Sequence, residues 1–183
     1  MSQVELNSLN NQEYLITEES EDDSEFSFIT TQGINYLVYF KEADGYVPFA
    51  SFANDTKMFG FGPTKETRPA GKLPKDAQVE IAIFEILYYY ISKYSNRILL
   101  FVCSDESIWH PGLENKHPRY AKWRSNTFSE WFENWQRTGV MPAEKIDYNL
   151  YGQLHCSCLF RSGNPYKVEV RQVIEQTILS KQP

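Results

Sequence analysis

The chain has 183 residues, a length typical of one domain, and 42% of them are hydrophobic, which is enough for a packed core. This composition excludes an intrinsically disordered chain, and three cysteines are too few for a disulfide scaffold. The net charge is −6, but the charged residues are unevenly placed along the chain.

Acidic residues are concentrated at the N-terminus. Residues 1–25 contain eight Asp or Glu residues and no Lys or Arg, so the rest of the chain is nearly neutral. They also lack a long apolar run, so the sequence predicts neither an export signal nor a membrane anchor. With free thiols in a reducing compartment, the predicted location is the cytoplasm. We interpret residues 1–24 as an acidic, partly disordered leader and residues 25–183 as a single α+β domain.

The first part of the domain has the alternating apolar pattern of a β meander. Ile34, Tyr36, Val38 and Phe40 would share one face of a strand, and Gly33 lies in a short link before them. The expected strands are residues 13–17, 26–30, 34–40, 46–52 and 57–61, with an acidic turn at residues 18–24.

A loop at residues 63–75 precedes the first expected helix. Asp76 is a suitable N-cap for a helix that runs to about Tyr94. Apolar residues cover most of this helix and leave a narrow polar line that includes Gln78, Glu85 and Lys93. Residues 98–103 form a continuous apolar run, typical of a central strand.

The second half predicts a helix, a hairpin and a final helix. Pro118 is suited to the first position of a helix that runs to about Arg137. The helical spacing predicts that Trp123, Trp131 and Trp135 of this helix lie in the core. The remaining elements are a strand at residues 145–151, a strand at residues 153–160, and a helix that begins at Asn164–Pro165 and ends near residue 179. The predicted fold is α+β, a mixed, mainly antiparallel sheet with about three helices, in the order meander-α-β-α-hairpin-α.

Arg124 is out of place on its helix, because it lies within the apolar stripe. A buried guanidinium requires a carboxylate or an anionic ligand. Asp105 and Glu106 follow the central strand and are the expected internal partners. The alternative is that Arg124 forms an anion site at the end of that strand, where open α/β sheets place ligands.

Three other patterns could indicate a metal site, an acid–base pair or a nucleic-acid-binding segment. Cys156 and Cys158 would share one face of a strand while His155 points to the other, so we expect buried thiols and no metal site. His110 and His117 could act with Asp105 or Glu106 as acid and base, but they match no catalytic motif. Residues 116–137 mix basic residues with tryptophans, as nucleic-acid binders sometimes do, yet the helical spacing favours a core role for the tryptophans.

The chain resembles a family of short bacterial proteins found mainly in Bacteroidetes. The resemblance lies in the run from Leu100 to Asp105, in Arg119 and Arg124 ahead of Phe128, in the aromatic meander, and in Asn164-Pro165-Tyr166. The loop at residues 106–117 is longer than in that family. The family has no established activity, so the resemblance implies a fold unit and no chemistry.

The order of elements is also similar to the later part of the GNAT acetyltransferase fold. In those enzymes a glycine-rich loop before the equivalent helix binds the pyrophosphate of coenzyme A. Here the corresponding residues include Arg68, Gly71 and Lys72, but Leu73 replaces a small residue and Pro74 removes an N–H donor. The resemblance therefore implies a relative that has lost catalysis rather than an active enzyme.

Taken together, these patterns favour a non-enzymatic binding or interaction module with no cofactor. The sequence does not identify the partner: a protein and a second copy of the chain are both compatible with it, and no membrane partner is expected. A GNAT-like acyltransferase that uses coenzyme A is the alternative, and a nucleic-acid-associated protein is the third hypothesis.

Overall fold

The computed structural model describes most of the chain. The described residues are 2–3, 14–43, 50–70, 73–103, 118–139, 142–150 and 154–180. They form an α+β fold with a mixed, mainly antiparallel sheet and three α-helices, which confirms the predicted fold class. Two compact units are present, one of Met1–Lys41 with Phe59–Tyr94 and one of Glu42–Met58 with Ser95–Pro183.

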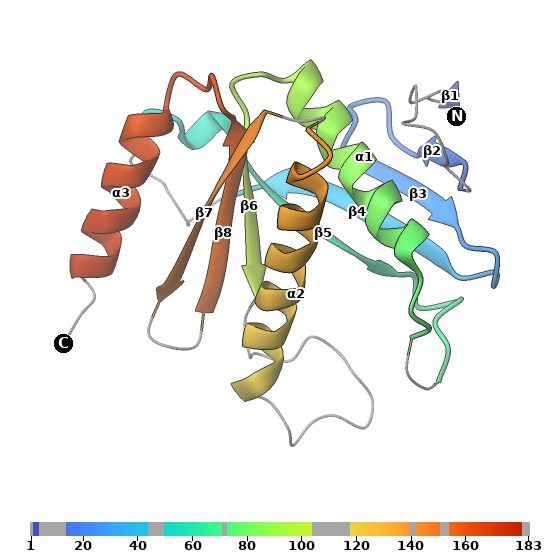
Figure 1. Cartoon of the computed structure of the whole chain (residues 1–183). Coiled ribbons are helices and arrows are strands. Elements are labelled where there is room, and N and C mark those ends of the chain that lie inside the picture. Colours follow the sequence, from blue (N-terminus) through green and yellow to red (C-terminus); the bar gives the residue numbers. More distant parts are fainter. Residues whose placement is uncertain are drawn as a thin grey trace. The chain divides into compact units, whose positions relative to one another are not determined.

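The first unit is an antiparallel meander with one helix. Its strands follow the order β1 to β5, and α1 lies across one face of β3 and β4 (Figure 1). Phe26 and Phe40 point to this face, where their rings contact Tyr89 and Tyr90 of α1 with centroids 5.8 and 3.8 Å apart. The elements are β1 (Ser2–Gln3), β2 (Ile16–Glu18), β3 (Glu25–Ile29), β4 (Asn35–Glu42), the second part of β5 (Thr56–Pro63) and α1 (Ala77–Lys93).

The ends of α1 follow the sequence prediction. Asp76 is the N-cap, and its carboxylate accepts a hydrogen bond from the Gln78 N–H at 3.0 Å. Tyr14 donates a hydrogen bond from its hydroxyl to the same carboxylate, so the segment before β2 is joined to the start of the helix. Capping of this kind satisfies amide groups that the first helical turn leaves free.

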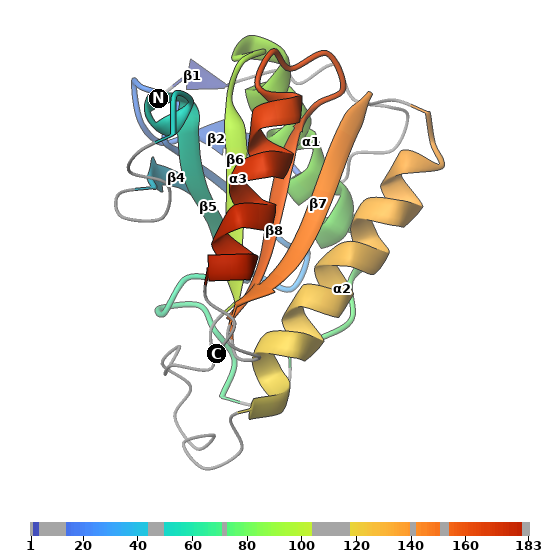
Figure 2. The same ribbon diagram turned by 90° about the vertical axis from the view of Figure 1, so that its left-hand side faces the viewer.

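The second unit is a three-layer arrangement. Thr56–Met58 of β5 pair in parallel with β6 (Ile98–Cys103), which pairs antiparallel with β8 (Leu154–Arg161), and β8 pairs with β7 (Ala143–Leu150). The helices α2 (Pro118–Gln136) and α3 (Lys167–Ser180) lie on opposite faces of this sheet (Figure 2). Phe101 contacts Phe128 of α2, whereas Ile98 and Leu100 share a core with Val170 of α3. A short 3₁₀ helix, Ala53–Asp55, precedes β5.

Three local expectations differ from the structure. Residues 46–49 of an expected strand lie outside the described residues, and residues 50–52 form a turn in which Phe52 is buried. Trp123 was expected in the core but its side chain is 62% exposed, because the buried stripe of α2 runs through Ala121, Phe128 and Trp135. The last helix starts at Lys167 rather than Pro165, since the Asn164 side chain first closes a turn onto the Tyr166 N–H.

Within the described part of the chain, no helix combines the length and the hydropathy needed to cross a bilayer.

Candidate functional site

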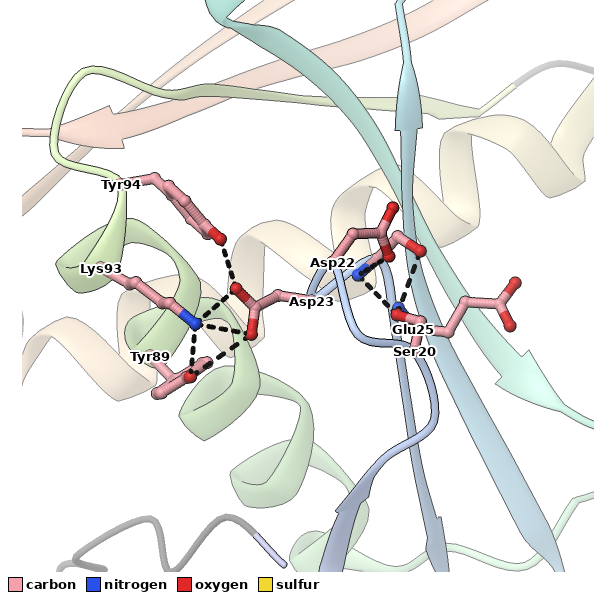
Figure 3. Close-up of polar contacts among 8 residues, drawn as sticks. Ser20, Asp22, Asp23, Glu25, Tyr89, Lys93 and Tyr94 are labelled. Carbon is pink, nitrogen blue, oxygen red and sulfur yellow. Dashed lines mark hydrogen bonds and ion pairs between the residues drawn. The ribbon is translucent and has the colours of Figure 1, made fainter. Parts of the chain in front are cut away.

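A cluster of charged and phenolic side chains surrounds Asp23, in the turn between β2 and β3 (Figure 3). Asp23 has a φ of 55°, in the left-handed region that Asp tolerates better than most residues. The Ser20 hydroxyl holds the turn by accepting hydrogen bonds from the N–H groups of Ser24 and Glu25 at 2.8 and 3.0 Å. This backbone directs the Asp23 side chain inward, where it is only 2% exposed.

The partners of Asp23 come from the C-terminal end of α1. Lys93 Nζ lies 2.5 Å from one carboxylate oxygen and 2.8 Å from the other. The Tyr94 hydroxyl donates to Asp23 Oδ2, and the Tyr89 hydroxyl donates to Oδ1 at 3.4 Å. Tyr89 and Lys93 are one helical turn apart, so they meet the carboxylate from the same side of α1.

A second carboxyl group, that of Glu18, shares this environment. Its hydrogen bond with Asp23 is the main cause that raises the pKa of Glu18, and burial adds to the effect. Burial also opposes the charge of Asp23, but hydrogen bonds with Glu18, Lys93 and Tyr94 outweigh it and lower the pKa of Asp23. When the pair carries a single proton, Glu18 therefore holds it and Asp23 is ionised.

The chemistry of the Asp23 cluster is that of a structural tie. Both oxygens of the carboxylate are bonded to the protein, and Lys93 is held by the same contacts. An acid or base in catalysis needs a face toward substrate, and this carboxylate is buried against the helix. What the cluster achieves is a fixed position for the turn and for the exposed acids beside it.

The sheet face opposite α1 carries exposed apolar side chains, and we call it the open face. Leu15 and Ile29 are each 61% exposed. The register pairs Ile16 with Phe28, so Leu15 and Ile29 lie at neighbouring positions one residue further along. The open face comprises the side chains that alternate away from α1, of which Ser27 is buried: Leu15, Thr17, Glu19, Glu25, Ser27, Ile29, Leu37 and Tyr39.

Tyr39 shapes the neighbouring strand on the open face. Its ring lies so close to Gly60 that a Cβ added there would meet the Tyr39 hydroxyl at 2.3 Å. A Cβ at Gly62, two residues along β5, would meet nothing within 4 Å. A side chain at position 60 would therefore overlap the Tyr39 ring, whereas there is open space for one at position 62.

Arg124 lies on α2 and is partly buried. Its positive charge acts on the Cys103 thiol, although burial is the larger effect and raises that pKa to about 11. The guanidinium is therefore near the last residue of β6, the strand end that the expected partners follow. Asp105 and Glu106 lie outside the described residues, so the ion pair and the anion site both stay predictions.

The candidate phosphate loop is described only in part. Arg68 is partly buried, and its N–H donates to the Thr64 carbonyl at 3.1 Å. Gly71 and Lys72 lie outside the described residues, as do His110 and His117. A coenzyme A site and a histidine acid–base pair therefore stay predictions.

The three thiols are buried. Cys156 and Cys158 point to the same face of β8, where both contact the Tyr148 hydroxyl, and His155 lies opposite Cys103 on the neighbouring strand. Burial raises the pKa of Cys156 to about 11 and that of Cys158 to about 12, which suppresses the reactive thiolate. Among the described residues, no three metal-ligating side chains converge.

A lysine and two serines meet between β7, β8 and α2. Lys145 Nζ lies 2.9 Å from the Ser129 hydroxyl and forms an ion pair with Asp147, which accepts a hydrogen bond from Ser157 at 2.6 Å. A serine beside a lysine is an arrangement found in some hydrolases. Here the amine is engaged with Asp147 and is not free to act as a base, so the contacts join the hairpin to α2.

Glu85, like Trp123, differs in burial from what the sequence predicts. It was expected on the polar line of α1, but it is only 6% exposed, and neither carboxylate oxygen has a hydrogen-bond partner. Burial raises its pKa to about 7. Glu85 lies one helical turn before the exposed Tyr88, at the edge between the buried and exposed faces of α1. Nothing in the local sequence shows on which side of this edge its side chain lies.

No family model, curated protein or solved structure matches the chain.

Proposed function

We propose that this chain is a non-enzymatic interaction module that binds a protein partner through the open face. The supporting observation is the pair of large apolar side chains, Leu15 and Ile29, exposed next to each other on a sheet face. Single exposed apolar residues are common on proteins, but adjacent ones on a flat sheet mark interaction surfaces or aggregation hazards. The Asp23 tie supports the proposal, because it holds the strand that carries Ile29 in one place.

The polar clusters of both units favour binding over catalysis. Asp23 and Asp147 are each engaged by a lysine and by hydroxyl groups, and burial makes the thiols of Cys156 and Cys158 poor nucleophiles.

We place the protein in the cytoplasm, because three buried free thiols suit a reducing compartment.

Site-specific photocrosslinking in the producing cells tests the proposal. A photoreactive phenylalanine analogue at position 29 should form covalent adducts with one protein or a few. The matched control is the same analogue at Val168, which is 66% exposed on α3 of the second unit. Adducts of equal yield and identity from both positions would contradict the proposal, because the open face would then be no more than accessible surface.

A GNAT-like acyltransferase is the second candidate, supported by the order of a meander, a helix, a strand and a helix. A thermal-shift titration with coenzyme A separates it from the binding module. A true ligand raises the melting temperature as its concentration exceeds Kd, by about 2.7 kcal/mol of stabilisation at one hundred times Kd. Parallel titrations with nucleotides and oligonucleotides test the nucleic-acid hypothesis in the same way.

A further inference from the structure

The open face is divided along its strands into an apolar end and an acidic end. Leu15 and Ile29 are neighbours at the apolar end. At the other end, Glu19 and Glu25 lie opposite each other, since the Glu19 N–H donates to the Glu25 carbonyl at 2.8 Å. The two pairs are four positions apart along the strands, which corresponds to about 13 Å at the usual rise.

The acidic end continues into the turn. Glu21 and Asp22 are exposed there, and Figure 3 shows Asp23 directed toward α1 while the Glu25 side chain points away from it. Like charges directly opposite each other in a sheet are destabilising. A base, Lys41 of β4, also lies near this end, with its ammonium 4.7 Å from the centroid of the Tyr39 ring.

The two ends of the face therefore differ in what they can bind. Two apolar side chains are exposed at one end, and exposed acids gather at the other, where the Glu19 carboxylate also accepts a hydrogen bond from the Ser27 hydroxyl. A ligand that contacts both ends favourably must carry apolar groups and positive charges at matching positions. Small cations satisfy only the acids, and an uncharged apolar surface satisfies only Leu15 and Ile29.

We infer that the open face takes a basic amphipathic segment of a protein partner, with its apolar side chains on Leu15 and Ile29 and its Lys or Arg residues at Glu19 and Glu25. This inference rests on the proposed function. Complementary charge selects the partner and speeds the encounter, while the apolar contact supplies most of the affinity.

Charge also argues against two other occupants. In a symmetric pair of copies, the acidic end of one face would meet either the apolar end or the acidic end of the other. Among the described residues of the face, Lys41 would then be the one base available to all of these acids. An anionic membrane would be repelled by the exposed acids of the turn and by a chain with a net charge of −6.

Two synthetic amphipathic helical peptides of equal length and identical leucine positions serve as probes. One carries lysine on its polar face and the other glutamate, and binding to the full chain is followed by fluorescence anisotropy at low and high salt. We expect the lysine peptide to bind at least ~10-fold more tightly than the glutamate peptide. Added salt should weaken the lysine peptide more than the glutamate peptide.

Variants of the full chain locate the site. Leu15→Ser with Ile29→Ser should weaken the lysine peptide about tenfold, and Glu19→Gln with Glu25→Gln should remove most of its salt dependence. Val168→Ser is the control and should bind as the parent does. All of these side chains are exposed, so unchanged melting temperatures verify that the variants are folded.

The outcomes distinguish this inference from the proposed function. If both peptides bind equally and both need Leu15 and Ile29, the open face is an interaction surface and the basic partner is wrong. If binding ignores Leu15 and Ile29, and no adducts form at position 29, the proposed function itself falls. Self-association in sedimentation that Ile29→Ser abolishes would replace the basic partner with a second copy, and vesicle binding that Ile29→Ser abolishes would replace it with a membrane.

Discussion

Asp23 and Lys93 form an ion pair, with Lys93 Nζ 2.5 Å from a carboxylate oxygen, that joins the β2–β3 turn to the last turn of α1. The two residues differ in exposure, because the Asp23 side chain is buried whereas Lys93 is 45% exposed. The aspartate therefore depends on the contact more than the lysine does. Since β3 carries Ile29 and Glu25, the pair also fixes the strand that forms much of the open face.

Asp23→Asn should destabilise the fold by about 2 kcal/mol at pH 6, because bonds to a charged group are lost while Asn still tolerates the backbone conformation. The pKa of Asp23 is lowered in the folded protein, so the ionised form stabilises the fold above its ordinary pKa of 3.8. The difference between parent and variant should shrink as the pH falls below that value and disappear once it has passed the lower pKa of the folded state. Denaturant unfolding at several pH values measures it, and Glu21→Gln, a change at a neighbouring exposed acid, should have little effect.

Glu18→Gln should raise the melting temperature at pH 7. The hydrogen bond with Asp23 raises the pKa of Glu18, so ionising Glu18 destabilises the folded state, and the amide removes that charge while keeping a donor. At pH 4 the parent already holds the proton, so the gain should vanish there. A gain that is equal at both pH values would show that the two carboxyl groups do not share a proton.

Gly60→Ala should destabilise the first unit by about 1–3 kcal/mol, because the new methyl group would overlap the Tyr39 ring. Gly62→Ala is the matched control on the same strand, since a Cβ there meets nothing. Chemical denaturation of both variants gives the comparison. Equal costs would mean that the backbone freedom of glycine, and not the close approach of Tyr39, determines the preference at position 60.

Much of the fold follows from local patterns in the sequence. Asp76 was predicted as an N-cap and is one, and the apolar run at residues 98–103 coincides with β6. Such features depend on neighbouring residues in the chain. The position of Trp123 was wrong although helical spacing could have shown it, because at about 100° per residue Trp123 lies well to one side of the buried Phe128 and Trp135.

The candidate site was less accessible to sequence reasoning. Arg124 was identified because a charge inside an apolar stripe is a local anomaly. The Asp23 cluster was missed because its members are up to 71 positions apart, and an acidic turn is normally solvated. The open face was missed for a similar reason, since alternation in residues 26–30 and 34–40 shows two faces but not which is left uncovered.

Arg124→Met should destabilise the protein by about 3 kcal/mol if Asp105 or Glu106 is the partner, because the change leaves a carboxylate without its counterion. Combining it with Asp105→Asn should recover part of the loss, and a double-mutant cycle gives the coupling. Loss of the guanidinium should also raise the pKa of the Cys103 thiol further, since Arg124 lowers it. Additive costs in cycles with both acids would favour the anion site instead.

Glu85→Met should stabilise the protein, and the gain should depend on pH. The folded-state pKa of Glu85 is about 7, above its ordinary value of 4.5, because burial disfavours the charged form. The parent therefore loses stability as the pH rises from 4.5 to about 7, by about 3 kcal/mol in total at 1.36 kcal/mol per unit. The stability difference between Glu85→Met and parent should grow by that amount between pH 4 and pH 8 in urea unfolding. Glu133→Met, an exposed glutamate of α2, is the control and should show no such growth. A gain that is constant with pH would show that Glu85 is ionised and compensated in the folded chain, and that its burial is not a cost.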